Sequence, residues 1–218
     1  MKKLVISIFM LLFALNAAEK YPDLQGKILK EIKYSDKTGD NVIVLTQTDI
    51  STREDENGIE HKSQDMFVYR YLNTQGQMQK KWQIHDFIHD CDLDGFEVKP
   101  FVDFVKISDE NHNQIKEVWI PYQLRCSGDP GPTETKIIAY EDRQKYALRG
   151  MSHEWGMGCD DKGKPEFGGG EYTLDDKLQE SAALKKFAIS LWEELNAEFT
   201  NPEFVKQAEE ICKSRQND

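Results

Sequence analysis

Between residues 26 and 151 the chain alternates short β-rich runs with polar segments. Each polar segment carries the Gly, Asn, Asp or Pro that a reversing backbone needs, and this alternation is typical of antiparallel strands joined by turns. The expected strands are Ile28 to Tyr34, Val42 to Thr48, Met66 to Leu72, Met78 to Phe87, Phe101 to Ile107, Ile115 to Leu124, Thr135 to Tyr140 and Lys145 to Arg149. The charged stretch Arg53 to Lys62 is expected to connect two of them, and Pro121 to mark a strand end or bulge near a sheet edge.

The pattern changes after residue 151. Residues 152–173 are rich in Gly and charge and show no regular period, so we expect a loop there. Helical spacing then predicts a helix from Leu174 to Phe199, with an apolar stripe that lies on the sheet. The stripe consists of Leu184, Phe187, Leu191 and Leu195. The run Asn201-Pro202-Glu203 has the features of a helix start and predicts a second helix to about Lys213. The predicted fold class is α+β, an antiparallel β-meander followed by two C-terminal helices.

The first residues have the layout of a secretory signal peptide. Lys2 and Lys3 precede an apolar run from Leu4 to Leu15, and the small residues Ala17 and Ala18 follow. The run is shorter than the roughly 20 apolar residues of a membrane-spanning helix, which makes an uncleaved anchor the weaker alternative. We therefore expect a signal peptide over residues 1–18 and a single globular domain over 19–218. Its parts are β-rich 26–151, the loop 152–173 and helical 174–214.

Composition narrows the range of partners. Aromatic residues make up 11% of the chain, which favours a packed core over disorder. The formal net charge is −11, and removal of Lys2 and Lys3 with the signal peptide would make it −13. Such a body repels nucleic acid and anionic lipid, so we expect neither as a partner. We also expect no stable membrane span in the mature chain, because the short apolar run is removed with the signal peptide. Cationic partners remain possible for such a body.

Four cysteines lie outside the predicted signal peptide: Cys91, Cys126, Cys159 and Cys212. In an oxidising compartment an even number favours disulfides, but four cysteines allow three connectivities and the sequence does not choose among them. We favour Cys91 with Cys126 and Cys159 with Cys212. The alternative is that one or both pairs are free, buried thiols.

One turn has the oxygen side chains of a calcium loop. Asp109, Asn111 and Asn113 alternate within it, and Glu117 could close the site from the next strand, since a hard cation prefers oxygen ligands. However, Gln114 occupies the position of the glycine that eases the sharp turn. An ordinary hairpin turn rich in Asn and Asp is therefore the favoured alternative, and we expect no cofactor other than this weak calcium candidate.

Other chemical motifs are incomplete. The run Asp90 to Gly95 matches the first half of an EF-hand loop, but Phe101 stands where the bidentate Glu belongs. His85 and His89 have the spacing of zinc ligands on a helix, although the surrounding residues favour a strand, in which they would lie about 13 Å apart. No nucleophile elbow or catalytic triad is present in the sequence, so we assign no catalytic residue and predict a non-enzymatic protein.

Several short segments resemble a known family. They are Trp82 to Cys91, Ile107 to Asp109, Glu117 to Tyr122, Cys126 to Pro130 and Lys145 to Gly150. In these segments the chain resembles small exported bacterial proteins that carry the label "surface polysaccharide biosynthesis protein" and have no assigned molecular activity. The resemblance implies pairing of Cys91 with Cys126 and a shared turn from Asp109 to Glu117, where Gln114 departs from the Gly-containing family pattern. His85 and His89 match no family residue.

Together with the resemblance, these observations predict an exported envelope protein of the bacterial periplasm or cell surface. It acts as a non-enzymatic binding or accessory protein linked to surface polysaccharide, with a protein or glycan of the envelope as its partner. Two alternatives remain open. An acidic periplasmic immunity or inhibitor protein that blocks a basic toxin or enzyme would fit the charge and the size. A small exported hydrolase that uses acidic side chains is the other alternative.

Overall fold

The computed structural model describes residues 20–215, which form two compact units. One unit contains residues 20–50 and 64–87, and the other contains 51–63 and 88–215. The signal peptide predicted over residues 1–18 lies outside the described residues. That residues 19–218 form a single domain stays a prediction.

The first unit is built on an antiparallel sheet. Its strands come from β1 (Lys27–Asp36), β2 (Gly39–Gln47), β4 (Glu60–Thr74) and β5 (Gln77–Cys91), and β2 lies between β1 and β4. Alternate residues of β2 and β4 face the same side and form an apolar cluster. The cluster consists of Tyr21, Val42, Val44, Phe67, Tyr69 and Tyr71. Tyr71 also donates a hydrogen bond to the carbonyl of Pro22, which fixes the segment that precedes β1.

The second unit contains a larger antiparallel sheet. Its order is β13 (Tyr172–Leu174), β10 (Gln144–Met151), β9 (Glu134–Glu141), β8 (Glu117–Ser127) and β6 (Gly95–Pro100), and β7 (Lys106–Ser108) also pairs with β8. A short 3₁₀ helix, η1 (Val102–Phe104), separates β6 from β7. Two hairpins complete the unit: β11 (Glu154–Cys159) pairs with β12 (Pro165–Gly168), and β3 (Ser51–Glu54) pairs with residues 60–63 of β4.

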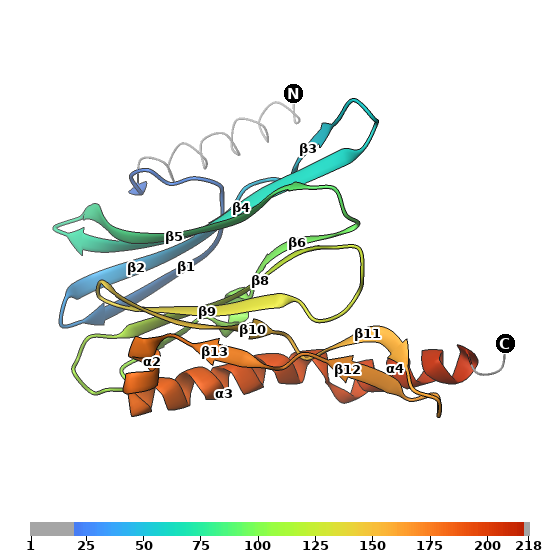
Figure 1. Cartoon of the computed structure of the whole chain (residues 1–218). Coiled ribbons are helices and arrows are strands. Elements are labelled where there is room, and N and C mark those ends of the chain that lie inside the picture. The colour runs from blue at the N-terminus through green and yellow to red at the C-terminus, as the bar shows by residue number, and fades with distance from the viewer. Residues whose placement is uncertain (1–19, 216–218) are drawn as a thin grey trace, which may run out of the picture. The chain divides into compact units, whose positions relative to one another are not determined.

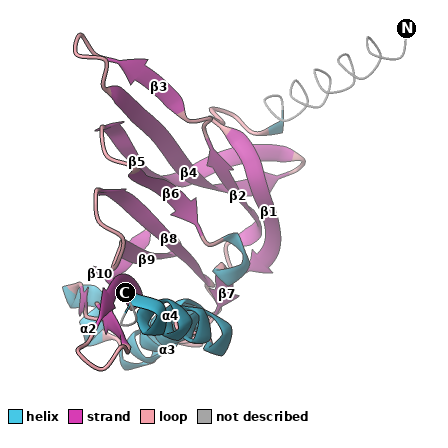
Figure 2. Ribbon diagram, turned by 90° about the vertical axis from the view of Figure 1, so that its right-hand side faces the viewer, coloured by secondary structure: helices cyan, strands magenta, loops and turns pink. Residues whose placement is uncertain are grey.

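Helices cover one face of this sheet (Figures 1 and 2). They are α2 (Asp176–Glu180) and α3 (Ala182–Phe199), whereas α4 (Pro202–Arg215) packs on the β11–β12 hairpin. The sheet contributes Trp119, Ile137, Ala139, Tyr146 and Leu148 to the shared core, and the helices contribute Leu178, Leu184, Ala188, Leu191 and Trp192. The predicted α+β class is confirmed, and Leu184, Leu191 and Leu195 of the predicted stripe are buried.

Several predicted elements differ from the structure, two of them in the C-terminal part. The segment 152–173 contains β11, β12 and the start of β13 instead of a loop. Trp155 lies opposite Phe167 in the hairpin, and both rings pack with α4, so tertiary contacts compensate for the glycines. The helix expected from Leu174 begins at Asp176 and is interrupted at Ser181, which has an extended backbone and caps α3 by accepting a hydrogen bond from the backbone N–H of Leu184.

Pro121 lies within β8 and does not end it, contrary to the prediction. On one side it lies opposite Ile137 of β9, and on the other its carbonyl accepts a hydrogen bond from the backbone N–H of Phe101. Since the N and O atoms of one strand residue point to the same side, the missing N–H faces the break between β6 and β7. Proline is tolerated here because η1 interrupts the neighbouring strand.

Both favoured disulfides are present in the second unit. Cys91 is bonded to Cys126 with a Cα–Cα distance of 5.8 Å, and Cys159 is bonded to Cys212 with a Cα–Cα distance of 5.7 Å. The first joins the end of β5 to β8, and the second joins β11 to α4. Two disulfides are typical of proteins that fold in an oxidising compartment.

Candidate functional site

A cleft opens in the second unit where α3 ends and α4 begins. Its volume is about 260 Å³. The lining residues are Glu97, Lys99, Gln123, Arg125, Thr133, Glu154, Trp155, Glu198, Phe199, Asn201 and Phe204. The cleft therefore combines aromatic rings with a small set of convergent polar groups, which is the usual composition of a small-ligand site.

The register of β6 and β8 places four polar side chains on one face of the sheet. Glu97 lies opposite Arg125, and Lys99 lies opposite Gln123. Opposed residues of an antiparallel pair share a face, as do residues two apart along a strand. Trp119 lies on the same face of β8 and packs in the core beneath α3. Beyond the end of that helix the face carries polar side chains and forms the floor of the cleft.

Gln123 positions a carboxylate in the cleft. Its side chain is 2% exposed, and its amide Nε2 donates to Thr135 Oγ1 and to Glu154 Oε1, both at 3.0 Å. Thr135 Oγ1 in turn donates to the carbonyl of Thr133 at 3.0 Å, which fixes its direction. Among residues 20–215 no group donates a hydrogen bond to the other oxygen of Glu154, Oε2. That oxygen is one of the acceptors that the cleft offers to a ligand.

Three aromatic rings form the apolar part of the cleft. Trp155 is largely buried, and its indole N–H donates to the carbonyl of Gly158 at 2.7 Å, so the polar end of the ring is already engaged. Its ring meets that of Phe204 edge to face with centroids 6.3 Å apart. Phe199 packs in the same manner on Phe101 at 5.9 Å. These contacts hold the rings in fixed orientations beside the polar floor.

The start of α4 sets the position of Phe204. Asn201 Oδ1 accepts a hydrogen bond from the backbone N–H of Phe204 at 3.0 Å, which is the N-cap contact predicted from the sequence. The Asn201 amide also donates to the carbonyl of Glu198 at 2.7 Å, tying the end of α3 to the start of α4. The turn between the two helices is therefore well ordered by its own side chains.

The charges in the cleft nearly balance. Glu97, Glu154 and Glu198 face Lys99 and Arg125. Lys99 Nζ lies 3.8 Å from Glu97 Oε1, and the Arg125 guanidinium donates to a backbone carbonyl at 2.7 Å. A cleft of this kind suits a ligand with many hydroxyl groups and little net charge, because a strongly charged ligand would meet like charges on either side.

The predicted calcium loop folds as a hairpin turn held by its own side chains. Asn111 Oδ1 accepts from the backbone N–H of Asn113, and Asn113 Oδ1 accepts from that of Ile115. Both Asn amides donate to Glu141 Oε1. Asp109 Oδ2 accepts from the N–H of Gln114, whose φ of 72° is the left-handed conformation that glycine favours. These are the contacts of the hairpin turn that was the favoured alternative.

Glu117, the fourth predicted calcium ligand, is fully buried at the start of β8. Its Oε2 accepts hydrogen bonds from Ser108 Oγ at 3.1 Å and from the backbone N–H of Glu110 at 3.0 Å, and its Oε1 has no hydrogen-bond partner among the described residues. Burial raises the pKa of the Glu117 carboxyl, and the negative charge of nearby Glu141 adds to the effect. Residues 20–215 contain no cluster of three His, Cys, Asp or Glu side chains arranged for a metal. Calcium binding stays a prediction.

The two histidines considered for zinc lie on β5, not on a helix. His85 Nε2 contacts Asp65 Oδ1 at 2.7 Å, and its ring stacks on Phe67 with centroids 4.4 Å apart. His85 therefore has a structural role in the first unit, as part of the sheet surface.

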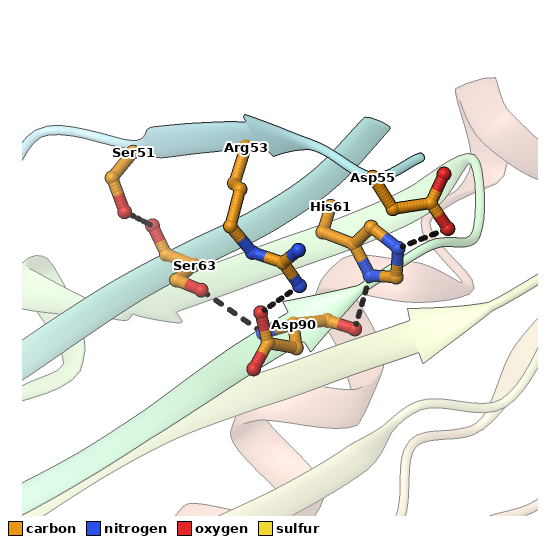
Figure 3. Close-up of polar contacts among 6 residues, drawn as sticks. All are labelled: Ser51, Arg53, Asp55, His61, Ser63 and Asp90. Atoms are coloured by element: carbon orange, nitrogen blue, oxygen red, sulfur yellow. Dashed lines mark hydrogen bonds and ion pairs between the residues drawn. The ribbon is translucent and has the colours of Figure 1, made fainter. Parts of the chain in front are cut away.

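The acidic run that begins at Asp90 takes part in a polar cluster at the β3–β4 hairpin (Figure 3). Asp90 Oδ1 accepts from the Arg53 guanidinium at 3.0 Å, and its backbone N–H donates to Ser63 Oγ at 2.9 Å. His61 lies between the Asp90 carbonyl, 3.3 Å from Nδ1, and Asp55 Oδ2, 3.4 Å from Nε2. The contacts fasten the hairpin to the end of β5, and both imidazole nitrogens are engaged, so neither is available to a substrate.

The cleft residues were not predicted from the sequence. Gln123 and Arg125 follow the apolar run of β8 at alternate positions, and that change was the available signal for a polar floor. Glu154 and Trp155 fell within the segment expected to be a loop. Their approach to β8 depends on the β11–β12 hairpin, which local sequence did not reveal.

Comparisons with known proteins add no family. The chain matches no family model, no curated protein and no solved structure. Within residues 20–215, none of the helices has the length and apolar character needed to cross a membrane.

Proposed function

We propose that this is an exported envelope protein that binds a surface polysaccharide, with the cleft between β8, β11 and the α3–α4 turn as its sugar site. The observation that carries the proposal is the composition of the cleft, in which fixed aromatic rings border a polar floor of nearly balanced charge. The axial and ring C–H groups of a sugar pack on aromatic faces, while its hydroxyl groups need donors and acceptors at the rim.

The residues have distinct roles in this proposal. Glu154 Oε2 accepts a hydrogen bond from a sugar hydroxyl, and Gln123 holds the carboxylate in that position. Phe199 and Phe204 supply the apolar surface. Export is supported by the signal-peptide pattern of residues 1–18 and by the two disulfides. The link to polysaccharide also rests on the resemblance to exported surface polysaccharide proteins.

Binding of neutral oligosaccharides to the mature chain tests the proposal. The capsular or surface glycan of the source cell, fragmented to oligosaccharides, would be titrated calorimetrically. We expect Glu154→Gln and Phe204→Ala each to weaken binding at least about tenfold, since each removes a contact to the ligand. The matched controls are Glu171→Gln and Ile211→Ala, which are exposed and outside the cleft, and these should bind as the wild type does.

The same titration separates the alternatives. Equal binding by wild type and both cleft variants would refute the cleft as the sugar site. Cleavage of the oligosaccharide during incubation, lost in Glu154→Gln, would instead favour the small exported hydrolase. Tight capture of a basic envelope protein without sugar binding would favour the inhibitor.

A further inference from the structure

A second hollow lies along β10 and α2, at a different place in the second unit. Its volume is about 480 Å³. It is lined by Arg143, Gln144, Lys145, Ala147, Arg149, Asp175, Asp176 and Lys177. Four of these eight residues are cations, in a chain with 28 Lys and Arg against 39 Asp and Glu.

The strand geometry gathers the cations. Lys145, Ala147 and Arg149 are two residues apart on β10, so their side chains share one face. Ala147 is buried, and the two flanking cations are exposed. Arg143 lies in the turn that leads into β10, and Lys177 lies in the first turn of α2. A small buried residue between two long cations leaves the hollow open between them.

The positive charges of the hollow are not neutralised by ion pairs. Within residues 20–215, the side chains of Arg143, Lys145 and Arg149 make no ion pair or hydrogen bond. Lys177 Nζ donates to the neutral amide oxygen of Gln144 at 2.8 Å. Elsewhere many lysines are paired with acids, as Lys106 is with Glu194 at 2.8 Å. The hollow therefore gathers several cations whose charge no neighbouring acid among the described residues neutralises.

The acids of the hollow offset only part of this charge. Asp175 Oδ1 accepts from the backbone N–H of Leu178 at 2.8 Å, because Asp175 is the N-cap of α2. Asp176 is the other carboxylate. Four cations against two carboxylates leave a local excess of positive charge. At physiological salt the Debye length is about 8 Å, so distant charges are screened. An anion in the hollow is therefore attracted by the nearby cations more strongly than it is repelled by the distant acidic surface.

We propose that this hollow binds the carboxylate groups of an acidic glycan. Arg guanidinium groups form paired hydrogen bonds with carboxylates, and Lys contributes a further charge. The spacing of Lys145 and Arg149 along β10, about 13 Å for residues four apart, allows contacts to more than one acidic sugar of a chain. That the polyanion is a glycan rests on the proposed function, whereas the preference for anions rests on the cations of the hollow alone.

Binding of the full mature chain to immobilised polyuronates tests this inference. The probes are polygalacturonate, alginate and hyaluronan, with neutral dextran as the uncharged polymer. We expect binding to at least one polyuronate, with a steep loss of affinity as salt is raised from 50 to 200 mM. Any binding of dextran, which carries no charge, should not change over this range of salt. The triple variant Arg143→Gln, Lys145→Gln, Arg149→Gln should bind at least about tenfold more weakly, since it removes charge-assisted hydrogen bonds.

A second triple variant controls for net charge. Lys37→Gln, Lys162→Gln, Lys186→Gln removes three exposed cations outside the hollow, so it should keep most of the affinity. Equal losses in the two triple variants would overturn the proposal, because the effect would then be one of overall charge. Absence of binding to all three polyuronates, or polyuronate binding that is as insensitive to salt as dextran binding, would also overturn it. Inorganic phosphate that competes as well as a hexauronate does would show a site for free anions and not for a glycan chain.

The cleft variants keep the two proposals distinct. Glu154→Gln should retain polyuronate binding, and the triple variant of the hollow should retain binding of neutral oligosaccharides. If neutral oligosaccharides do not bind but polyuronates bind through Arg143, Lys145 and Arg149, the sugar site in the cleft is refuted and the acidic-glycan site stands. If neutral oligosaccharides bind in the cleft but polyuronates do not bind in the hollow, only the acidic-glycan site is refuted.

Discussion

Removal of the Cys159–Cys212 disulfide should release α4 and with it one wall of the cleft. The half-cystine Cys212 is fully buried near the end of α4, where it packs with Ala208 and Trp155. The two cysteines are separated by 53 residues. A crosslink across a loop of that length lowers the entropy of the unfolded chain enough to contribute about 4 kcal/mol to the free energy of unfolding. The double variant Cys159→Ser, Cys212→Ser should lose an amount of that order.

The second disulfide provides a matched comparison. Cys91 and Cys126 are 35 residues apart, and the same relation again gives about 4 kcal/mol. The two double variants should therefore lose similar global stability in urea unfolding. They should differ in where protection is lost. In the variant that lacks Cys159 and Cys212, amide hydrogen exchange in α4 should become faster than global unfolding allows. In the variant that lacks Cys91 and Cys126, exchange in α4 should occur only through global unfolding.

The cleft gives a functional measure of the same effect. Phe204 is held at the start of α4, so an undocked helix removes its ring from the cleft. Loss of the Cys159–Cys212 bond should weaken ligand binding in the cleft more than loss of the Cys91–Cys126 bond does. A variant that lacks Cys159 and Cys212 but retains slow exchange in α4, and loses less than about 1 kcal/mol, would refute the reasoning.

Three further substitutions test separate features. Burial raises the pKa of Glu117, so the native state binds a proton at this carboxyl more tightly than the unfolded state does. The free energy of unfolding should therefore fall as the pH rises from the pKa of the unfolded state through that of the folded state. Glu117→Gln should remove this pH dependence in thermal unfolding. The Nε of buried Arg70 donates a hydrogen bond to Asn41 Oδ1 at 2.9 Å. Asn41→Ala removes this acceptor and should lower the free energy of unfolding in urea by about 1–3 kcal/mol. A Cβ on Gly150 would lie 2.1 Å from the backbone oxygen of Glu171, so Gly150→Ala should lower stability by about 1–3 kcal/mol or more in the same assay.

Each of these substitutions has a control of the same chemistry. Glu56→Gln and Asn57→Ala change exposed residues of the β3–β4 hairpin, and Gly128→Ala adds a methyl group where nothing lies within 4 Å. All three should stay within about 0.5 kcal/mol of wild type. A Glu117→Gln profile parallel to that of wild type would contradict the assigned pKa shift. If Asn41→Ala loses no more stability than Asn57→Ala, the role of the buried Arg70 contact is contradicted. If Gly150→Ala loses no more than Gly128→Ala, the close approach at Gly150 is contradicted.

The sequence predicted the fold where the signal was local. The alternating runs that became β1, β2, β4, β8, β9 and β10 carry their periodicity within a few residues, and the Asn201 cap was evident from three consecutive residues. The hairpin of β11 and β12 was missed because its glycines predict a loop. It forms because Trp155 and Phe167 can pack against α4, about forty residues further along the chain.

The cleft was harder to predict than the fold for the same reason. Its members come from β6, β8, β11 and the α3–α4 turn, and only the strand register brings Glu97 beside Arg125. Conversely, Asp109, Asn111 and Asn113 are close in sequence and have the oxygens of a calcium loop, yet backbone N–H groups of the turn take up an oxygen of each. Sequence spacing could not distinguish a ligand from a turn-forming side chain.

The order of the disulfides affects how the chain reaches its native state. Each bond joins neighbouring cysteines along the sequence, Cys91 with Cys126 and then Cys159 with Cys212. A chain that emerges with its N-terminus first therefore presents each unpaired cysteine with its correct partner as the next one to appear. Oxidation in order of emergence yields the native bonds directly, so folding of the emerging chain should need little thiol–disulfide reshuffling.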